Sequence, residues 1–265
     1  MNDSKIWWGE FDLGCGDVGC WEVGGTRLWV DHCTDEWRLA WQRDPAADEA
    51  LVRVTIPADE AVPEKVDERL RLAVSGGGAR LRVVPALADR SVVSRPETPF
   101  SVLAGESITL YLSTPLWWRL ELVEGGKQLH EVAIQRPSDT WFGASTVEGE
   151  LCYASRTHCR RRREELVPRP YRAVTQLKVD NRTEAPLLLE RINLPVPTLS
   201  LFQDAAGGLW TQSAVLLRKP DDEMATLRLE ERPPADIGPV ERVGGPRQRS
   251  ERTFMTRAFG ALFKD

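Results

Sequence analysis

Apolar and polar residues alternate with a period of two along most of the chain, and Gly, Pro, Asn or Asp interrupts the alternation. The segment TRLWVDHCTDEWRLAWQRD predicts a hairpin, with Leu28 and Val30 on one face of its first strand. Trp37, Leu39 and Trp41 line one face of the return strand. Similar segments, separated by glycine pairs and triplets, continue to about residue 231. Many short strands at regular spacing are typical of sandwiches and barrels, so we expect an all-β fold.

Shifts in composition divide the chain into four predicted parts. Residues 1–94 form a Trp-rich N-terminal β domain, and residues 95–232 form a second β-sandwich domain. Residues 233–249 are dense in Pro, Gly and charge, which is typical of a linker. Residues 250–265 have the 3.6-residue apolar period of a helix. We therefore expect two β-sandwich-like domains, followed by a linker and a C-terminal amphipathic helix.

The predicted C-terminal helix has one apolar face and begins at a plausible N-cap, Ser250. A helix of this length is marginal alone in water, so its apolar face needs a covering surface. The chain's own body, a second copy of it, a groove on a partner protein or a membrane interface could provide that surface. The Pro/Gly-rich segment before it favours a partner. The expected docking residues are Phe254, Met255, Ala258, Phe259, Leu262 and Phe263.

Charge and hydropathy narrow the function classes. The net charge of the 265 residues is −5, which argues against non-specific binding to nucleic acid. From Asp236 to Asp265 there are six Lys/Arg and four Asp/Glu residues, so a basic tail follows an acidic body. No run approaches the roughly 18 apolar residues that span a bilayer. The N-terminal residues lack the pattern of a signal peptide. We therefore expect a cytoplasmic protein without a transmembrane segment.

The cysteines and histidines offer a weak case for zinc. Cys15 and Cys20 could face each other across the turn GDVG, and His32-Cys33 and His158-Cys159 each pair two potential ligands. The C-x2-C spacing of zinc sites is missing, however, and adjacent residues of a strand point to opposite faces. The sequence therefore predicts buried thiols and surface imidazoles, with no metal site and no cofactor.

A catalytic pair of Cys152 and His158 is also disfavoured. On a continuous strand the two residues share a face but lie roughly 20 Å apart. A nucleophile and its base need hydrogen-bond contact. We therefore predict no catalytic residues here.

The densest charge block is a run of arginines followed by Glu164-Glu165. One interpretation is a site for an anion or an acidic partner. The other is a solvated strand end that its own glutamates balance. The candidate anion site consists of Arg160, Arg161, Arg162 and Arg163.

The segment PSDTWFGASTVEGELCY places an indole among carboxylates. Paired carboxylates about 5 to 10 Å apart can hydrolyse glycosides, and Glu148 and Glu150 would share a strand face. An exposed tryptophan can also stack on a sugar, although most of the ten tryptophans are expected to be in the core or at an interface. The candidate ligand loop consists of Asp139, Trp141, Phe142, Glu148 and Glu150.

Several stretches, in their spacing along the chain, resemble a prokaryotic domain family of unknown function. They are WWGEF, RVVPALADR, STPLWWRLEL, SDTWFG, EGELCYASRT, RAVTQLKVDN and ERINLPVP, and they extend to about Pro197. Members of that family are often encoded beside small mechanosensitive channels of the bacterial inner membrane. The resemblance implies an accessory role near such a channel, and it supplies no catalytic residues.

These observations favour a non-enzymatic binding or regulatory protein that docks through its C-terminal helix. Its expected partner is a protein, with the cytoplasmic domain of a membrane channel as the first candidate, which would hold the chain at the periphery of the inner membrane. Homo-oligomerisation is left open. The alternative is a carbohydrate-binding or glycoside-hydrolysing β-protein that uses the loop around Trp141.

Overall fold

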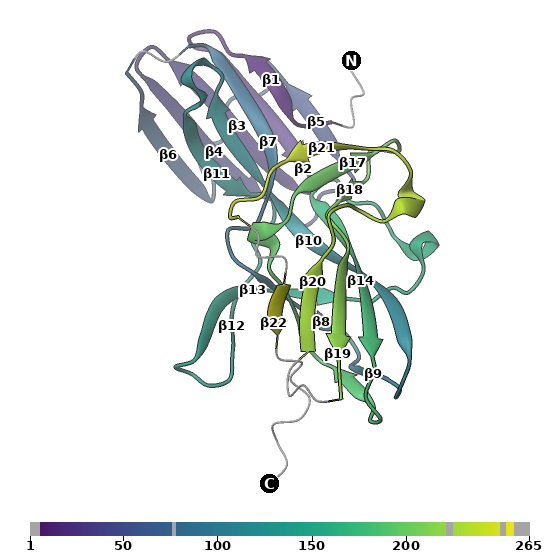
Figure 1. The fold of residues 1–265 in the computed structure, drawn as a ribbon. Helices are drawn as coiled ribbons and strands as arrows, with labels where there is room; N and C mark the ends of the chain where they lie inside the picture. Colours follow the sequence, from purple (N-terminus) through teal and green to yellow (C-terminus); the bar gives the residue numbers. More distant parts are fainter. Residues whose placement is uncertain (1–5, 76–77, 221–224, 250–252, 257–265) are drawn as a thin grey trace. The chain divides into compact units, whose positions relative to one another are not determined.

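The computed structural model describes residues 6–75, 78–220, 225–249 and the backbone of 253–256, and these residues form an all-β protein (Figure 1). The helical elements among them are 3-10 turns of three residues each. The expected all-β fold class is confirmed. The chain divides into two compact units. Unit 1 comprises Met1–Ala86, Leu116–Gln135 and Pro168–Tyr171, and unit 2 comprises Leu87–Pro115, Arg136–Val167 and Arg172–Asp265.

This division differs from the expected pair of contiguous domains with a boundary at residue 94. The chain returns to unit 1 after that boundary, because the second half of strand β10 (Ser107–Leu122) and strand β11 (Gln128–Ala133) belong to it. Residues 107–115 of β10 belong to unit 2. A composition shift along the sequence cannot reveal such a return.

Unit 1 contains two sheets. One is five-stranded and antiparallel, in the order β5-β2-β3-β4-β6, and the other has the order β1-β7-β10-β11. Phe11 in β1 meets Trp21 in β2 edge to face, with ring centroids 5.2 Å apart, so the two sheets face each other. The remaining elements of unit 1 are β1 (Gly9–Asp12), β2 (Val18–Val23), β3 (Thr26–Cys33), β4 (Glu36–Arg43), β5 (Val52–Thr55), β6 (Glu68–Ala73), β7 (Arg80–Leu87) and the turn η1 (Glu124–Gly126).

The predicted hairpin at the centre of unit 1 is present. Strand β3 ends at Cys33 and β4 begins at Glu36, and the register pairs Val30 with Leu39. Leu28, Trp29 and Val30 each lie opposite an apolar residue of β4, so their burial excludes water from a continuous surface. The fully buried tryptophans of this unit are Trp7, Trp21, Trp37 and Trp118.

The main sheet of unit 2 is built around β14 (Arg172–Asn181). Strand β10 pairs with one edge of β14. The other edge is shared, because β18 pairs with its first half and β19 with its second half. From there the sheet continues through β17 and β21 on one branch and through β20 and β22 on the other. These strands are β17 (Leu201–Asp204), β18 (Leu209–Trp210), β19 (Ala214–Arg218), β20 (Ala225–Leu229), β21 (Val240–Gly244) and β22 (Thr253–Thr256).

Unit 2 holds a second sheet in the order β12-β13-β8-β16 and a separate pair of strands, β9 and β15. Arg172 of β14 donates a hydrogen bond to the Ser155 hydroxyl of β13 at 3.1 Å, which ties the two larger sheets together. The elements are β8 (Val92–Pro96), β9 (Phe100–Val102), β12 (Asp139–Gly143), β13 (Gly149–Thr157), β15 (Leu187–Leu189), β16 (Ile192–Leu194) and the turns η2 (Arg163–Glu165), η3 (Val196–Thr198) and η4 (Ala235–Ile237).

The predicted linker over residues 233–249 is wrong, because this stretch belongs to unit 2. It contains η4 and strand β21, which is antiparallel to β17. Arg247 then donates from its main-chain nitrogen to the carbonyl oxygen of Pro197 at 2.8 Å. Backbone hydrogen bonds hold the stretch in place. Every residue except proline has a main-chain N–H that can donate such a bond, so a linker-like composition does not prevent them.

The predicted C-terminal helix is also wrong where the structure describes the tail. Residues Thr253–Thr256 form strand β22, antiparallel to β20, with Met255 opposite Thr226 and Phe254 opposite Leu227. A strand forms here for two reasons. It provides hydrogen-bond partners for the backbone groups along an edge of β20, and Thr and Phe have a high propensity for strands. The rest of the predicted helix, residues 250–252 and 257–265, lies outside the described residues. Among the helices that are described, none has the length and apolarity needed to span a lipid bilayer.

Candidate anion-binding site

The arginine run follows strand β13 and lies along the edge of β10. The main-chain N–H of Tyr111 donates to the carbonyl oxygen of Arg160 at 2.9 Å, which forms an isolated antiparallel bridge. The run then enters the turn η2, where Leu166 N–H donates to the carbonyl oxygen of Arg163 at 3.0 Å. The Tyr111 bridge therefore holds the arginine loop, residues 158–165, beside strand β10, and the second hydrogen bond closes the turn within the loop.

Cys159 gives this loop its bend. Its φ is 45°, which places a non-glycine residue in the left-handed region. Its N–H donates to the Thr157 hydroxyl at 3.1 Å, and its side chain is 8% exposed. The buried side chain and the hydrogen bond offset the unfavourable backbone conformation. Strand β13 ends at Thr157, and the chain bends at Cys159, immediately before the arginines.

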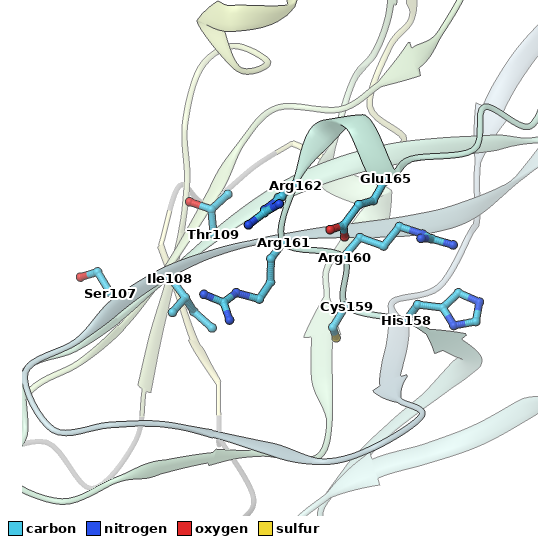
Figure 2. Close-up of a pocket in the computed structure, with 9 residues that line it drawn as sticks. All are labelled: Ser107, Ile108, Thr109, His158, Cys159, Arg160, Arg161, Arg162 and Glu165. Carbon is cyan, nitrogen blue, oxygen red and sulfur yellow. The ribbon is translucent and has the colours of Figure 1, made fainter.

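The loop and strand β10 enclose a pocket of about 790 Å³ that opens to solvent. Figure 2 shows the side chain of Arg162 extending toward Thr109 and that of Arg161 extending toward Ile108, whereas Arg160 extends the other way, to the side of His158. The lining contains three guanidinium groups and one carboxylate, so positive charge is in excess. The lining residues are Ser107, Ile108, Thr109, His158, Cys159, Arg160, Arg161, Arg162 and Glu165.

The four arginines of the run are not equivalent. Arg163 donates from Nη1 to the carbonyl oxygen of Asp236 at 2.6 Å, and its guanidinium lies 6.0 Å from the ring centroid of Trp210. This arginine is a structural residue that does not line the pocket. The side chains of the range Arg160–Arg162 make no ion pair within the described part of the chain. Their donors are therefore available to a ligand.

Unpaired guanidinium groups are suited to one kind of chemistry. A guanidinium presents several N–H donors in a planar fork that matches a carboxylate or a phosphate. The pocket also has hydroxyl groups on Ser107 and Thr109. The Ser107 hydroxyl is already donated to Asp180 at 2.9 Å, so the hydroxyl of Thr109 is the one that remains for a ligand. The arrangement can bind an anionic group, and it contains no pair of side chains arranged as nucleophile and base.

The cysteine of the pocket is not a reactive thiolate. Burial raises the pKa of Cys159 to about 11, although a hydrogen bond from Thr157 opposes the rise. Burial also raises the pKa of Cys152 to about 12. Both thiols are therefore protonated near neutral pH. Cys152 packs with Val93 and Phe142, whereas Nδ1 of His158 lies 2.8 Å from the Glu97 carboxylate, so the two residues do not form a pair.

His32 and Cys15, two further candidate metal ligands, contact neighbouring residues of the fold. Nδ1 of His32 lies 2.9 Å from the carbonyl oxygen of Leu13, and its ring stacks on Trp37 with centroids 4.3 Å apart. Cys15 is exposed, with its sulfur 3.5 Å from the Thr34 hydroxyl. Within the described ranges the cysteines are free thiols, and no group of three His, Cys, Asp or Glu side chains is placed to hold a metal ion.

The candidate ligand loop around Trp141 forms a hairpin of β12 and β13. The register pairs Trp141 with Leu151 and Phe142 with Glu150, so Trp141 and Glu150 lie on opposite faces. Glu148 precedes β13 and lies in the turn. Asp139, at the start of β12, accepts hydrogen bonds from the guanidinium groups of Arg90 and Arg136. The structure therefore does not bring the indole and the Glu150 carboxylate together.

The side chains of the predicted docking residues in the tail lie outside the part of the chain that the structure describes. Phe254 and Met255 belong to strand β22, of which the structure describes the backbone. Ala258, Phe259, Leu262 and Phe263 lie outside the described residues.

The strand residues of the pocket were not predicted from the sequence. The alternation in SITLYLS does place Ser107 and Thr109 on one face of a strand. Nothing in that alternation indicates that a loop about 50 residues further along lies beside them. The contact depends on the single bridge at Tyr111.

Comparison with known families assigns the chain. Residues 7–264 match the DUF432 family, which is described as a protein of unknown function. Comparisons with curated proteins and with solved structures give no match. The match covers nearly the whole chain, in agreement with the resemblance that the sequence stretches carry. The chain therefore belongs to DUF432, a family of proteins of unknown function.

Proposed function

We propose that this chain is a non-enzymatic binding protein whose Arg160–Arg162 pocket holds an anionic group of its partner. The observation that supports the proposal is that Arg160, Arg161 and Arg162 all line one open pocket and that none of them makes an ion pair in the described structure. Elsewhere arginines are commonly paired, as Arg71 is with Glu36 at 2.6 Å and Arg119 with Glu131 at 2.6 Å. Unpaired cations gathered at one concave surface favour a ligand that supplies the missing charge.

The partner is proposed to be a protein. The chain's own charge of −5 disfavours nucleic acid as the ligand. The family resemblance, with its neighbourhood of small mechanosensitive channels, makes the cytoplasmic domain of such a channel the first candidate. In that case the chain works in the cytoplasm, at the periphery of the inner membrane, as an accessory to the channel. The carbohydrate alternative has less support, because Trp141 and Glu150 occupy opposite faces of their hairpin.

The test uses inorganic phosphate as the probe, with binding followed by isothermal titration calorimetry. The double variant Arg161→Gln/Arg162→Gln removes two donors from the pocket. Removing an exposed ionic contact weakens binding by about two- to fivefold, so the double variant is expected to bind about tenfold more weakly. Binding by the unaltered chain should also weaken as salt is added, because salt screens exposed charges.

The matched control is Arg156→Gln/Arg191→Gln. Both residues are exposed in unit 2, lie outside the pocket, and give the same change in net charge. The control is expected to bind phosphate as the unaltered chain does. Equal weakening in both double variants would show that net charge alone attracts the anion. That result, or no binding by the unaltered chain at millimolar phosphate, would overturn the proposal.

A further inference from the structure

The arginine pocket opens onto a wider surface of the same sheet. A second pocket of about 690 Å³ in unit 2 is lined by residues of β14, β19 and β20 and by the segment that follows β20. The register connects the two pockets. Thr109 of the arginine pocket lies directly opposite Lys178, which lines the second pocket.

The row that begins at Thr109 continues across the sheet. Lys178 lies beside Val215 in β19, and Val215 lies opposite Arg228 in β20. Residues in register on neighbouring strands project from the same face of a sheet. The residues that alternate with them are buried, as Leu177 and Leu216 are. The sheet therefore has one core face and one open face, and Thr109 of the arginine pocket lies on the open face together with Lys178 and Val215 of the second pocket.

An apolar cluster closes one end of this open face. Tyr111, two residues beyond Thr109 on β10, packs with Trp210 and Ile237. The Tyr111 hydroxyl accepts a hydrogen bond from Gln176 at 3.3 Å, and Gln176 accepts one from Ser213 at 3.3 Å. These contacts hold Tyr111, Gln176 and Ser213 in place, in the row of the open face next to the one that begins at Thr109. The open surface thus has a rigid floor that runs across four strands.

The second pocket also has an excess of positive charge, because three cations, Lys178, Arg228 and Arg232, line it with two carboxylates, Glu230 and Glu231. Lys178 and Arg232 line the second pocket, and neither makes an ion pair within the described ranges of the chain. Arg228 is paired with Glu230 at 2.8 Å. The lining also contains Val215, so it is neither uniformly basic nor uniformly polar.

We infer that the two pockets form one binding surface for an extended acidic peptide segment of the partner, which crosses the strands from β10 to β20. Three strand spacings of about 4.8 Å separate β10 from β20, a distance of roughly 14 Å. An extended peptide rises about 3.3 Å per residue, so carboxylates four residues apart are about 13 Å apart and can reach both pockets. A single small anion reaches one pocket only.

The composition of the surface favours a peptide over a nucleic acid. A uniform polyanion would place phosphates against Glu165 and Glu230, which line the two pockets. A peptide can instead place polar or apolar side chains at those positions and against Val215. This inference rests on the proposed anion site and adds the class of ligand and its length.

The test uses two synthetic peptides as probes, with binding measured on the full chain. One carries Glu-Ser-Thr-Ser-Glu between glycines, and the other replaces the second Glu with Gln. The peptide with two carboxylates is expected to bind about two- to fivefold more tightly. The variant Lys178→Gln/Arg232→Gln should abolish that difference and leave phosphate binding unchanged, whereas Arg156→Gln/Arg191→Gln should preserve the difference.

The outcomes separate this inference from the proposed function. If the difference between the peptides persists in Lys178→Gln/Arg232→Gln while phosphate still binds, the extended surface is wrong and the anion site stands. If Arg161→Gln/Arg162→Gln leaves phosphate binding unchanged, the proposed function itself fails. If an oligothymidylate of matched charge displaces the two-carboxylate peptide from the unaltered chain at lower concentration than unlabelled peptide does, a nucleic acid is the better ligand and the peptide assignment is overturned.

Discussion

The main-chain N–H of Tyr111 lies 2.9 Å from the carbonyl oxygen of Arg160, and this bridge brings the arginine loop to the edge of strand β10. Without it, Thr109 and the guanidinium groups would belong to separate parts of unit 2. With it, a hydroxyl from one segment and cations from another line the same pocket. Four predictions test this site and the packing of the two units.

Thr109→Val is expected to weaken phosphate binding by about fivefold, because it removes the one hydroxyl of the pocket that remains for a ligand, worth about 1 kcal/mol. Valine keeps the shape and the strand preference of threonine, so the free energy of unfolding should change by less than about 0.5 kcal/mol. Calorimetric titration and urea unfolding of the same preparation give both quantities. Unchanged affinity would remove Thr109 from the site.

Cys159→Val is expected to be less stable than Cys159→Ala by about 1–3 kcal/mol. The φ of 45° is strained for any residue with a Cβ and more so for a β-branched one. Both variants lose the thiol, so the difference between them reports on β-branching in this backbone conformation and on the packing of two added methyl groups at a buried site. Urea unfolding measures it. Equal stability would mean that the loop relaxes out of the left-handed conformation at little cost.

Stability should fall as pH rises above about 9, in part through the buried thiol of Cys152. Burial raises its pKa from 9.0 to about 12, so above pH 9 the unfolded chain loses this proton and the folded chain keeps it. Ionisation then favours the unfolded state, by roughly 1.4 kcal/mol per pH unit up to about pH 12. Cys152→Ala lacks this contribution, so its unfolding free energy should fall less steeply in that range. Parallel pH profiles for the two proteins would contradict the assignment.

Gly24→Ala is expected to destabilise unit 1 by several kcal/mol. Gly24 has a φ of +56°, and a Cβ there would collide with the ring of Tyr171, which is 1% exposed and has little room to move. The matched control is Gly125→Ala, since Gly125 has a φ of +79° but open space around its Cβ position. The control should lose only about 1 kcal/mol, from backbone strain alone. Thermal unfolding of the two variants compares the cost of the steric collision with the cost of backbone strain alone.

The parts of the fold that depend on local pattern were predictable from the sequence. The alternation of Leu28 and Val30 with polar neighbours predicts β3, and the facing residues of β4 follow from the same rule. The arginine run stood out as a charge block, and three of its four members line the pocket. That Arg163 is a structural residue depends on its contact with the carbonyl oxygen of Asp236, which is 73 residues away.

The failures have a common physical cause. A short segment whose sequence suits both a helix and a strand adopts the structure that its tertiary contacts stabilise. Residues 253–256 therefore pair with the edge of β20, although the tail has a helical pattern. Residues 233–249 resemble a linker in composition, but backbone hydrogen bonds to Pro197 and to strand β17 hold them. Non-local pairing of this kind leaves no local mark in the sequence.

Strand β10 belongs to both units, and this affects how the protein is synthesised and how its gene can recombine. Because its residues before 116 belong to unit 2 and those from 116 onward to unit 1, no single cut in the chain yields both units whole. On the ribosome, unit 1 is complete only once Tyr171 has emerged, when much of unit 2 has already been synthesised. Recombination at a single site cannot exchange one unit for a foreign one without breaking the other. The two units therefore have to be passed on together, as one gene segment.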